Sequence, residues 1–253
     1  SNHLAATSRL CEHFGIKCFG FVRGDEMNKK SNPTIEHCIN TGMQLEYLNR
    51  EEYKLKLFSK KVKNFLSKRN LYLIPEGGAN DFGIVGSTEM IGSFDHTFDT
   101  ICLAVGTGGT IVGVSRSLNK DQKLLGFLSV NDSSRSDYIS NCINSSVNYE
   151  LINEFNFGGF GKFNNELIIF INFFKKKYKI PLDPIYTGKV LFGIFTLINN
   201  HNWRWGKNIL FIHTGGLQGI DGVNFLQEKK FLLEPRIVIT KIILGLTQAL
   251  LVR

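Results

Sequence analysis

The chain has 253 residues, of which 43% are hydrophobic and 21% are charged. These values are typical of a globular protein that buries a core, and they exclude the disordered and fibrous classes. The five cysteines are scattered without CxxC spacing, so the sequence predicts neither a disulfide framework nor a metal site. No signal-peptide pattern is present in the first residues, and we expect a cytoplasmic protein.

The formal net charge of +8 raises the question of a nucleic-acid partner. Lysines cluster at Lys60, Lys61 and Lys63, and again at Lys175–Lys177. Both clusters lie within helical patterns, and no zinc-finger, RRM or helix-turn-helix signature accompanies them. Solvated helix faces are the better interpretation, so we expect no nucleic-acid partner.

In the first part of the chain, helical and strand patterns alternate, which indicates parallel strands joined by crossover helices. Gly15 follows the first helical pattern as a C-cap, and Pro33 suits the first turn of the second helix. The expected elements are helix His3–Phe14, strand Lys17–Val22, helix Pro33–Asn40, strand Gln44–Leu48, a long basic helix Glu51–Arg69 and strand Tyr72–Ile74.

The second part of the chain repeats this alternation. The stretch Asn131–Val147 is rich in serine and asparagine and is expected to form a variable surface excursion. The expected elements are strand Thr100–Val105, the loop Gly106–Thr110, a helix to Leu118, strand Lys123–Val130, helices Asn164–Tyr178 and Lys189–Asn200, and strand Asn208–Ile212.

The tail Arg236–Arg253 is mostly apolar but is interrupted by Lys241. It is too short and too broken for a membrane span, so we expect no contact with a membrane. The pattern is typical of a docking helix or of a non-native extension.

The segment Gly106–Thr110 follows an apolar strand and opens a helix. Glycines let several backbone N–H groups turn toward one point, the helix N-terminus adds partial positive charge, and threonine hydroxyls donate hydrogen bonds. Such a loop binds a phosphate, although a strand-to-helix turn that merely needs glycine has the same pattern. The loop matches neither the P-loop nor the dinucleotide fingerprint.

Five motifs occur in order along the chain: Ser1–His3, Ile74–Asn80, Gly106–Thr110, Leu182–Lys189 and Phe211–Gly216. Together they resemble the aminocyclopropane-carboxylate deaminase and D-cysteine desulfhydrase family. The resemblance covers residues 1 to about 225. It implies the tryptophan-synthase-β-like fold of pyridoxal-phosphate enzymes (fold type II), which is α/β and two-lobed with a parallel sheet. It also implies a homodimer.

The resemblance implies roles for individual residues. The cofactor phosphate would be held by Gly106, Thr107, Gly108, Gly109 and Thr110. Asn2 would donate a hydrogen bond to the phenolic oxygen of the pyridoxal ring, Thr214 would face the pyridine nitrogen, and Ser1 would lie beside the substrate. Tyr186 would be an acid/base or nucleophile-activating group above the substrate.

Plain structural interpretations stay open for several of these positions. Tyr186 lies between a proline and a glycine and could be a packed turn aromatic, and Thr214 could be a helix N-cap. His213 is more typical of a satisfied core histidine than of a catalytic one. Asn80 could be a turn residue that tolerates positive φ. His3 could cap its own helix region or contact the cofactor site.

Pyridoxal-phosphate chemistry needs a lysine amine that forms a Schiff base with the cofactor. In the family this lysine lies upstream of the Ser–Asn–His motif, and the first residue of this chain is the serine of that motif. Lys189 matches a different family position. We therefore expect either an N-terminally incomplete sequence or a protein that has lost the activity, and we favour the first.

A second departure is Phe160, which stands where the resemblance places a tyrosine. A phenyl ring keeps the stacking surface but has no proton to give, so the opening of a cyclopropane ring is more in doubt than cofactor binding.

The function implied is pyridoxal-phosphate-dependent deamination or β-elimination of a small amino acid, by a lyase or hydrolase. The candidate substrates are 1-aminocyclopropane-1-carboxylate and D-cysteine, between which the sequence does not decide. The alternative is a non-catalytic protein that binds the cofactor or an anionic metabolite. Residues 1–80 are expected to form the smaller lobe, 81–235 the larger cofactor-binding lobe with one sheet edge unpaired, and 236–253 a tail of uncertain role.

Overall fold

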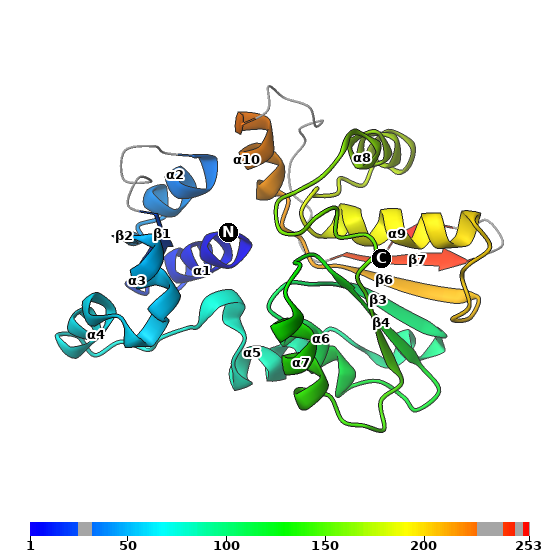
Figure 1. Cartoon of the computed structure of the whole chain (residues 1–253), viewed down its shortest axis with the longest axis horizontal. Helices are drawn as coiled ribbons and strands as arrows, with labels where there is room; N and C mark the ends of the chain where they lie inside the picture. The colour runs from blue at the N-terminus through cyan, green and yellow to red at the C-terminus, as the bar shows by residue number, and fades with distance from the viewer. Residues whose placement is uncertain (25–31, 227–239, 246–249, 253) are drawn as a thin grey trace.

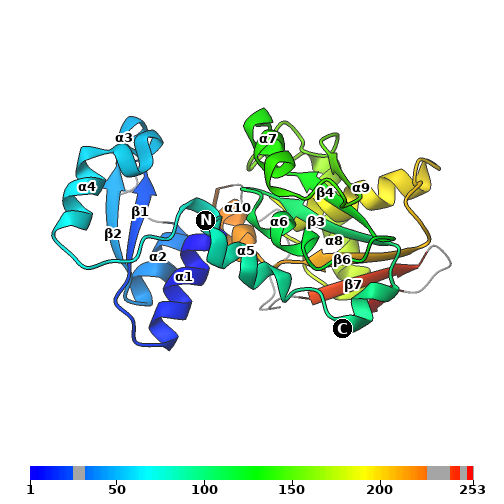
Figure 2. The ribbon, with the colours of Figure 1, turned by 90° about the horizontal axis from the view of Figure 1, so that it is seen from below.

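The computed structural model of the chain describes residues 1–24, 32–226, 240–245 and 250–252. It consists of a small lobe and a large lobe that lie side by side (Figures 1 and 2). Both lobes combine parallel strands with helices, so the expected α/β class is confirmed. Within the described ranges, no helix has the length and apolar character needed to cross a membrane.

The small lobe is built around a two-stranded parallel sheet in which Phe19 is paired with Gln44. Its helices begin at polar caps: the side chains of Ser1, Asn32 and Asn49 each accept a hydrogen bond from a backbone N–H three residues on. The elements are α1 (Asn2–His13), β1 (Phe19–Arg23), α2 (Pro33–Asn40), β2 (Gln44–Leu48), α3 (Arg50–Leu55), η2 (Lys56–Phe58) and α4 (Lys60–Ser67).

Two expectations for this lobe are wrong. The single helix Glu51–Arg69 is divided because Lys56 has a positive φ of 49° and the side chain of Ser59 caps a new helix. Tyr72–Ile74 is not a strand: it pairs with neither strand of the described small sheet and leads into Pro75 and the short helix η3 (Glu76–Gly78).

The large lobe contains a six-stranded sheet in the order β5-β4-β3-β6-β7-β8. The first four of these strands are parallel, and the last two are antiparallel to their neighbours. The strands are β3 (Thr100–Val105), β4 (Lys123–Leu128), β5 (Tyr149–Ile152), β6 (Asn208–His213), β7 (Thr240–Gly245) and β8 (Leu250–Val252).

Helices cover both faces of this sheet (Figure 1). Side chains alternate along β4: Leu125 and Phe127 pack against α8 (Asn165–Tyr178) and α9 (Thr187–Asn199), whereas Leu124 and Leu128 face the opposite layer. The opposite layer contains α5 (Asp81–Thr88), η4 (Ser93–Thr97), α6 (Gly109–Ser115) and α7 (Ser133–Cys142). The last helix, α10 (Gln218–Leu226), contacts α2 of the small lobe.

The described part of the tail corrects one further expectation. It forms β7 and β8 rather than a docking helix, and the segment Thr240–Gly245 contains Thr240, Ile242 and Ile243, which favour strands. β7 pairs with all of β6, from Asn208 to His213. The expected surface excursion Asn131–Val147 contains α7, which Asp132 caps by accepting a hydrogen bond from the backbone N–H of Ser134.

Candidate active site

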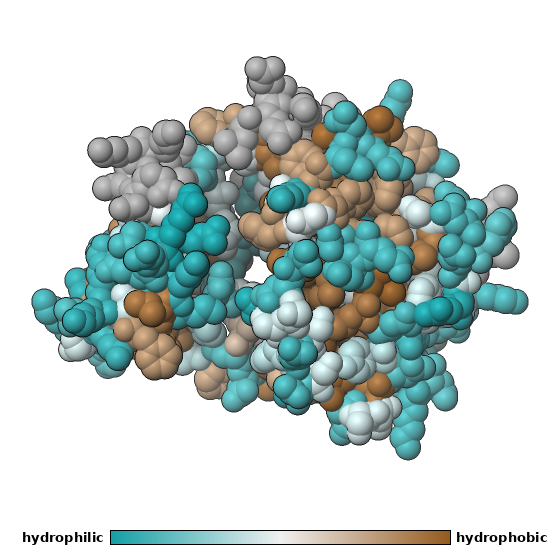
Figure 3. All heavy atoms as spheres, in the orientation of Figure 1, coloured by the Kyte–Doolittle hydropathy of each residue, from teal (hydrophilic) through white to brown (hydrophobic). Residues whose placement is uncertain are grey.

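The carboxyl ends of β3 and β6 meet at one edge of the large sheet. The two strands are parallel neighbours, with Cys102 opposite Phe211. The loops that follow them, 106–110 and 214–216, therefore leave the sheet side by side. This edge faces the small lobe, and Figure 3 shows the surface hollowed between the two lobes.

The loop Gly106–Thr110 has the geometry of an anion cradle. Gly108 has a φ of +98° and precedes α6, whose first residues Gly109 and Thr110 have no intrahelical acceptor for their N–H groups. A Cβ on Gly109 would lie 3.2 Å from Cα of Ala79, so the loop packs closely against the turn before α5. Unpaired N–H groups at the start of a helix suit an anion such as a phosphate group.

The turn around Gly77 packs against this loop. Gly77 has a φ of +72°, and a Cβ there would lie 2.5 Å from Oγ1 of Thr107. Gly78 lies against the ring of His3, and burial lowers the pKa of His3 while the charge of Glu76 opposes this shift. The second and third motifs are thus in contact, with His3 of the first motif beside them.

Asn80 does not have the role of a turn residue with positive φ. Its φ is −136°, and its side chain caps α5 by accepting a hydrogen bond from the N–H of Gly83 at 2.9 Å. The positive φ angles of this turn belong to Gly77 and Gly78.

The first motif also reaches the loop that follows β6. Oδ1 of Asn2 accepts a hydrogen bond from Nε2 of Gln218 at 2.5 Å, and a Cβ on Gly216 would collide with the amide of Asn2. Ser1 is exposed, and its hydroxyl caps α1 by accepting a hydrogen bond from the N–H of Leu4 at 3.3 Å. Asn2 therefore joins the two lobes at the cleft.

Thr214 directly follows β6 and is half-buried. It is not the N-cap of α10, because that helix begins at Gln218. His213 is a satisfied core histidine, as its pattern suggested: its Nδ1 accepts from the N–H of Gly215 and its Nε2 lies 2.9 Å from the carbonyl oxygen of Pro181.

Tyr186 stands at the start of α9, on a turn organised by a buried carboxylate. Asp183 accepts hydrogen bonds from the backbone N–H groups of Ile185, Tyr186 and Thr187 at 2.7–2.9 Å. The tyrosine ring faces Gly106, where a Cβ would lie 3.2 Å from it. Burial, with the negative charges of Asp183 and Glu76, raises the pKa of Tyr186 to about 12.

Phe160 and Tyr186 form an edge-to-face pair with ring centroids 6.1 Å apart. Phe160 is 57% exposed, so burial alone does not hold it there. The residue that departs from the family pattern thus lies beside the phenol of the fourth motif, on the same wall of the site.

Lys189 lies close to the pair formed by Phe160 and Tyr186 and was not predicted from the sequence as part of the site. It lies on α9, is 1% exposed, and donates hydrogen bonds to two backbone carbonyl oxygens of the loop that carries Phe160. The available signal was a lone lysine between Gly188 and the apolar run that follows it.

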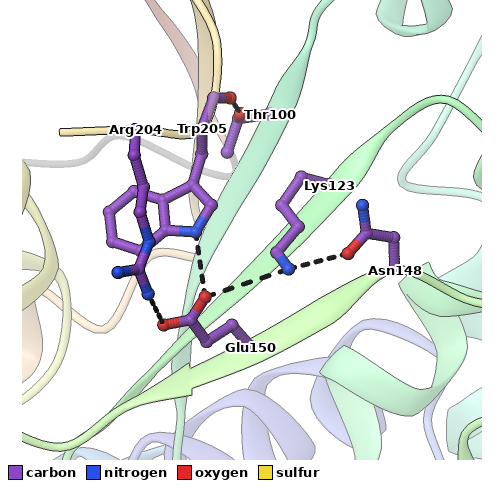
Figure 4. Close-up of polar contacts among 6 residues, drawn as sticks. All are labelled: Thr100, Lys123, Asn148, Glu150, Arg204 and Trp205. Carbon is purple, nitrogen blue, oxygen red and sulfur yellow. Dashed lines mark hydrogen bonds and ion pairs between the residues drawn. The ribbon is translucent and has the colours of Figure 1, made fainter.

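A polar cluster at the amino ends of the strands was also missed (Figure 4). Glu150 accepts hydrogen bonds from Arg204 at 2.8 Å and from Nε1 of Trp205 at 2.9 Å, and pairs with Lys123 at 3.8 Å. Thr100 donates to the carbonyl oxygen of Trp205. Because this cluster lies at the sheet edge opposite to Gly106, it fastens the chain before β6 and plays no part in the site.

No protein-family model matches the chain. A Pyrococcus horikoshii protein provisionally named a 1-aminocyclopropane-1-carboxylate deaminase is 29% identical, over 87% of this chain and 72% of the relative. The mitochondrial bifunctional D-cysteine desulfhydrase/1-aminocyclopropane-1-carboxylate deaminase of Arabidopsis thaliana is 28% identical, over 87% and 62%.

Among solved structures, an ACC deaminase homologue is 26% identical and covers 91% of this chain and 74% of its own, with a TM-score of 0.76. An L-serine ammonia-lyase from Rhizomucor miehei, 13% identical with a TM-score of 0.55 over 81% of this chain and 72% of its own, shares the fold alone. By sequence and by fold, the chain is a homologue of the aminocyclopropane-carboxylate deaminase and D-cysteine desulfhydrase family, with the type II fold of pyridoxal-phosphate enzymes.

Proposed function

We propose that the protein is a pyridoxal-phosphate-dependent enzyme that deaminates a small amino acid or eliminates its β-substituent. The observation that carries this proposal is the contact of distant motifs at one sheet edge. Asn2 meets Gly216, Gly77 meets Thr107, and Gly106 meets Tyr186. A non-catalytic binding protein is less favoured, because the relatives over most of the chain bear enzyme names.

Different residues of the site would bind different groups of the cofactor. The N–H groups and hydroxyls of the loop Gly106–Thr110 would bind the phosphate, Asn2 the phenolic oxygen, and Thr214 the pyridine nitrogen. The cofactor supplies an electron sink for negative charge at the Cα of the substrate. Because the hydroxyl of Thr214 is neutral, it does not stabilise a protonated pyridine nitrogen as a carboxylate would, which moderates this electron withdrawal.

Tyr186 would serve as the proton donor at the substrate. The phenol is protonated at neutral pH and therefore carries the proton to be delivered, while burial raises its pKa to about 12 and makes it a weaker acid than a free tyrosine. Ser1 would lie beside the substrate, where α1 begins.

Substrate choice would depend on the pair formed by Phe160 and Tyr186. D-Cysteine would give pyruvate, sulfide and ammonia, and 1-aminocyclopropane-1-carboxylate would give 2-oxobutanoate and ammonia. Ring opening requires proton delivery to a carbon, whereas a thiol is already a good leaving group. Without a phenol at Phe160, D-cysteine is the preferred substrate.

The test compares both substrates in the wild type and in Phe160→Tyr, with the protein expressed from its complete reading frame. The substitution should increase the kcat/KM for 1-aminocyclopropane-1-carboxylate more than that for D-cysteine. A wild type that already opens the cyclopropane efficiently, with no effect of Phe160→Tyr, would contradict the assigned specificity.

The protein would work in the cytoplasm as a homodimer, with residues 1–80 as the smaller lobe and 81–235 as the larger one. The compartment is supported by five free cysteines. Sedimentation equilibrium at micromolar concentration tests the assembly: twice the mass of the chain is expected, and the mass of one chain would contradict it.

A further inference from the structure

Lys189 is an unusual buried cation. Its side chain is 1% exposed, and its Nζ donates hydrogen bonds to the carbonyl oxygens of Asn156 and Gly159, each at 2.8 Å. Burial lowers the pKa of Lys189 to about 8, against the negative charge of Asp183, which raises it. A buried amine is costly unless its donors are satisfied, so these two carbonyl oxygens account for its tolerance in the core.

The loop that Lys189 binds has a strained backbone, and one aromatic contact also joins it to α9: the ring of Phe157 lies edge-to-face against that of Phe192, with centroids 5.3 Å apart. Phe157 has a positive φ of 56°, which is strained for a residue with a side chain, and the glycines after it also have positive φ. The internal bonds of the loop are local: the N–H of Gly158 donates to Oδ1 of Asn156 at 2.7 Å, and the N–H of Gly159 to the carbonyl oxygen of Asn156 at 3.0 Å. Lys189 adds two hydrogen bonds from α9 to the backbone of this loop.

The hydrogen bonds of Lys189 act on a loop that forms part of the site. Phe160 follows Gly159, and its ring lies edge-to-face against Tyr186 although more than half of it is exposed. Tyr186 precedes Lys189 by one helical turn, at the start of the same helix. The ammonium group of Lys189 therefore joins the loop carrying Phe160 to the helix carrying Tyr186.

We propose that Lys189 is a positioning residue, which fastens the Asn156–Gly161 loop to α9 and so fixes Phe160 against Tyr186 on one wall of the site. The importance of that wall for substrate rests on the proposed function. The fastening itself does not, and it is measurable without turnover.

The test is hydrogen exchange of the peptide that covers residues 155–162 in the whole protein, without substrate. Lys189→Met keeps most of the volume and removes the donors. In this variant, the amides of the Asn156–Gly161 loop should exchange at least about tenfold faster than in the wild type. The amides of β3 and β4 should keep their exchange rates. The control is Lys175→Met, which removes another buried lysine, on α8, and should leave the loop unchanged.

A second pair of variants reaches the same contact from the loop. Gly159→Ala places a side chain at a φ of +114° and displaces the carbonyl oxygen that Lys189 binds. Gly161→Ala introduces similar strain at a φ of +70°, in open space and away from Lys189. Gly159→Ala should loosen the loop as Lys189→Met does, and Gly161→Ala should do so much less.

Kinetics distinguish positioning from mere loss of stability. Lys189→Met and Gly159→Ala should lower kcat/KM for D-cysteine by similar factors, whereas Lys175→Met should not. Exchange in Lys189→Met equal to that in the wild type would overturn the proposal. If Lys189→Met does not fold, equal loosening by Gly159→Ala and Gly161→Ala would overturn it. A protein without turnover that still shows the expected exchange pattern would refute the proposed function and leave the fastening supported.

Discussion

The ring of Tyr186 lies so close to Gly106 that a Cβ on this glycine would come within 3.2 Å of Cε1 and 3.5 Å of the phenolic oxygen. The proposed phosphate loop and the proposed proton donor are therefore in contact through a position that has no room for a side chain. If the loop binds the cofactor as proposed, this contact would couple that binding to the placement of the phenol.

Gly106→Ala should consequently weaken the binding of pyridoxal phosphate by about tenfold, because either the loop or the ring must move. The control is Gly86→Ala in α5, where a Cβ meets nothing within 4 Å. Spectrophotometric titration of both variants measures the affinity. Equal affinities would show that the loop and the ring are independent.

Tyr186 is expected to remain a phenol throughout the working pH range. Burial and the charges of Asp183 and Glu76 raise its pKa to about 12, so phenolate absorbance below pH 11 should be the same in the wild type and in Tyr186→Phe. The same substitution should reduce turnover by about 10²–10⁴-fold, the usual contribution of a general acid. An additional tyrosine titrating near pH 10 in the wild type would contradict the assigned environment.

Lys189 should make the stability of the protein depend on alkaline pH. Its pKa is about 8 in the fold and near its ordinary value of 10.5 when unfolded, so between these values the unfolded state binds more protons. Stability relative to Lys189→Met should therefore rise with pH across this window and be constant below pH 8. Urea unfolding at several pH values gives the difference, expected to be on the order of 1–3 kcal/mol. A difference that falls with rising pH has the wrong sign for a buried amine.

The site could be predicted from the sequence where its geometry is local. The loop Gly106–Thr110 follows an apolar strand, and the turn that presents Tyr186 depends on Asp183, three residues before it. Lys189 could not be predicted, because its partners are backbone carbonyl groups 33 and 30 residues earlier. Any residue type offers such a carbonyl, so the pairing leaves no trace in the sequence.

The fold shows the same division between local and distant causes. Helices with a local cap, such as α8 at Asn164, were predicted nearly to the residue. The break at Lys56 was missed because lysine seldom has a positive φ and no glycine or proline marks the site. The strand β7 was missed because its antiparallel partner, β6, lies far away in the sequence.

Pyridoxal phosphate is expected to bind residues 1–253 without a covalent bond to any of their lysines. Lys189 is the first candidate for such a bond because it lies near Tyr186. Its amine, however, already donates hydrogen bonds to two carbonyl oxygens. Borohydride reduction of this chain with the cofactor, followed by peptide mass spectrometry, should find no pyridoxyl group. A label mapped to one of these lysines would contradict the expectation and would identify the Schiff-base amine.

The central claim is that this site breaks down a small amino acid with the help of pyridoxal phosphate. The most direct measurement is the turnover of D-cysteine by the protein expressed from its complete reading frame, first stripped of cofactor and then reconstituted. We predict that pyruvate and sulfide appear in equal amounts only after pyridoxal phosphate is restored, and that Gly106→Ala requires more cofactor for the same rate. Cofactor binding without keto acid from either D-cysteine or 1-aminocyclopropane-1-carboxylate would contradict the claim.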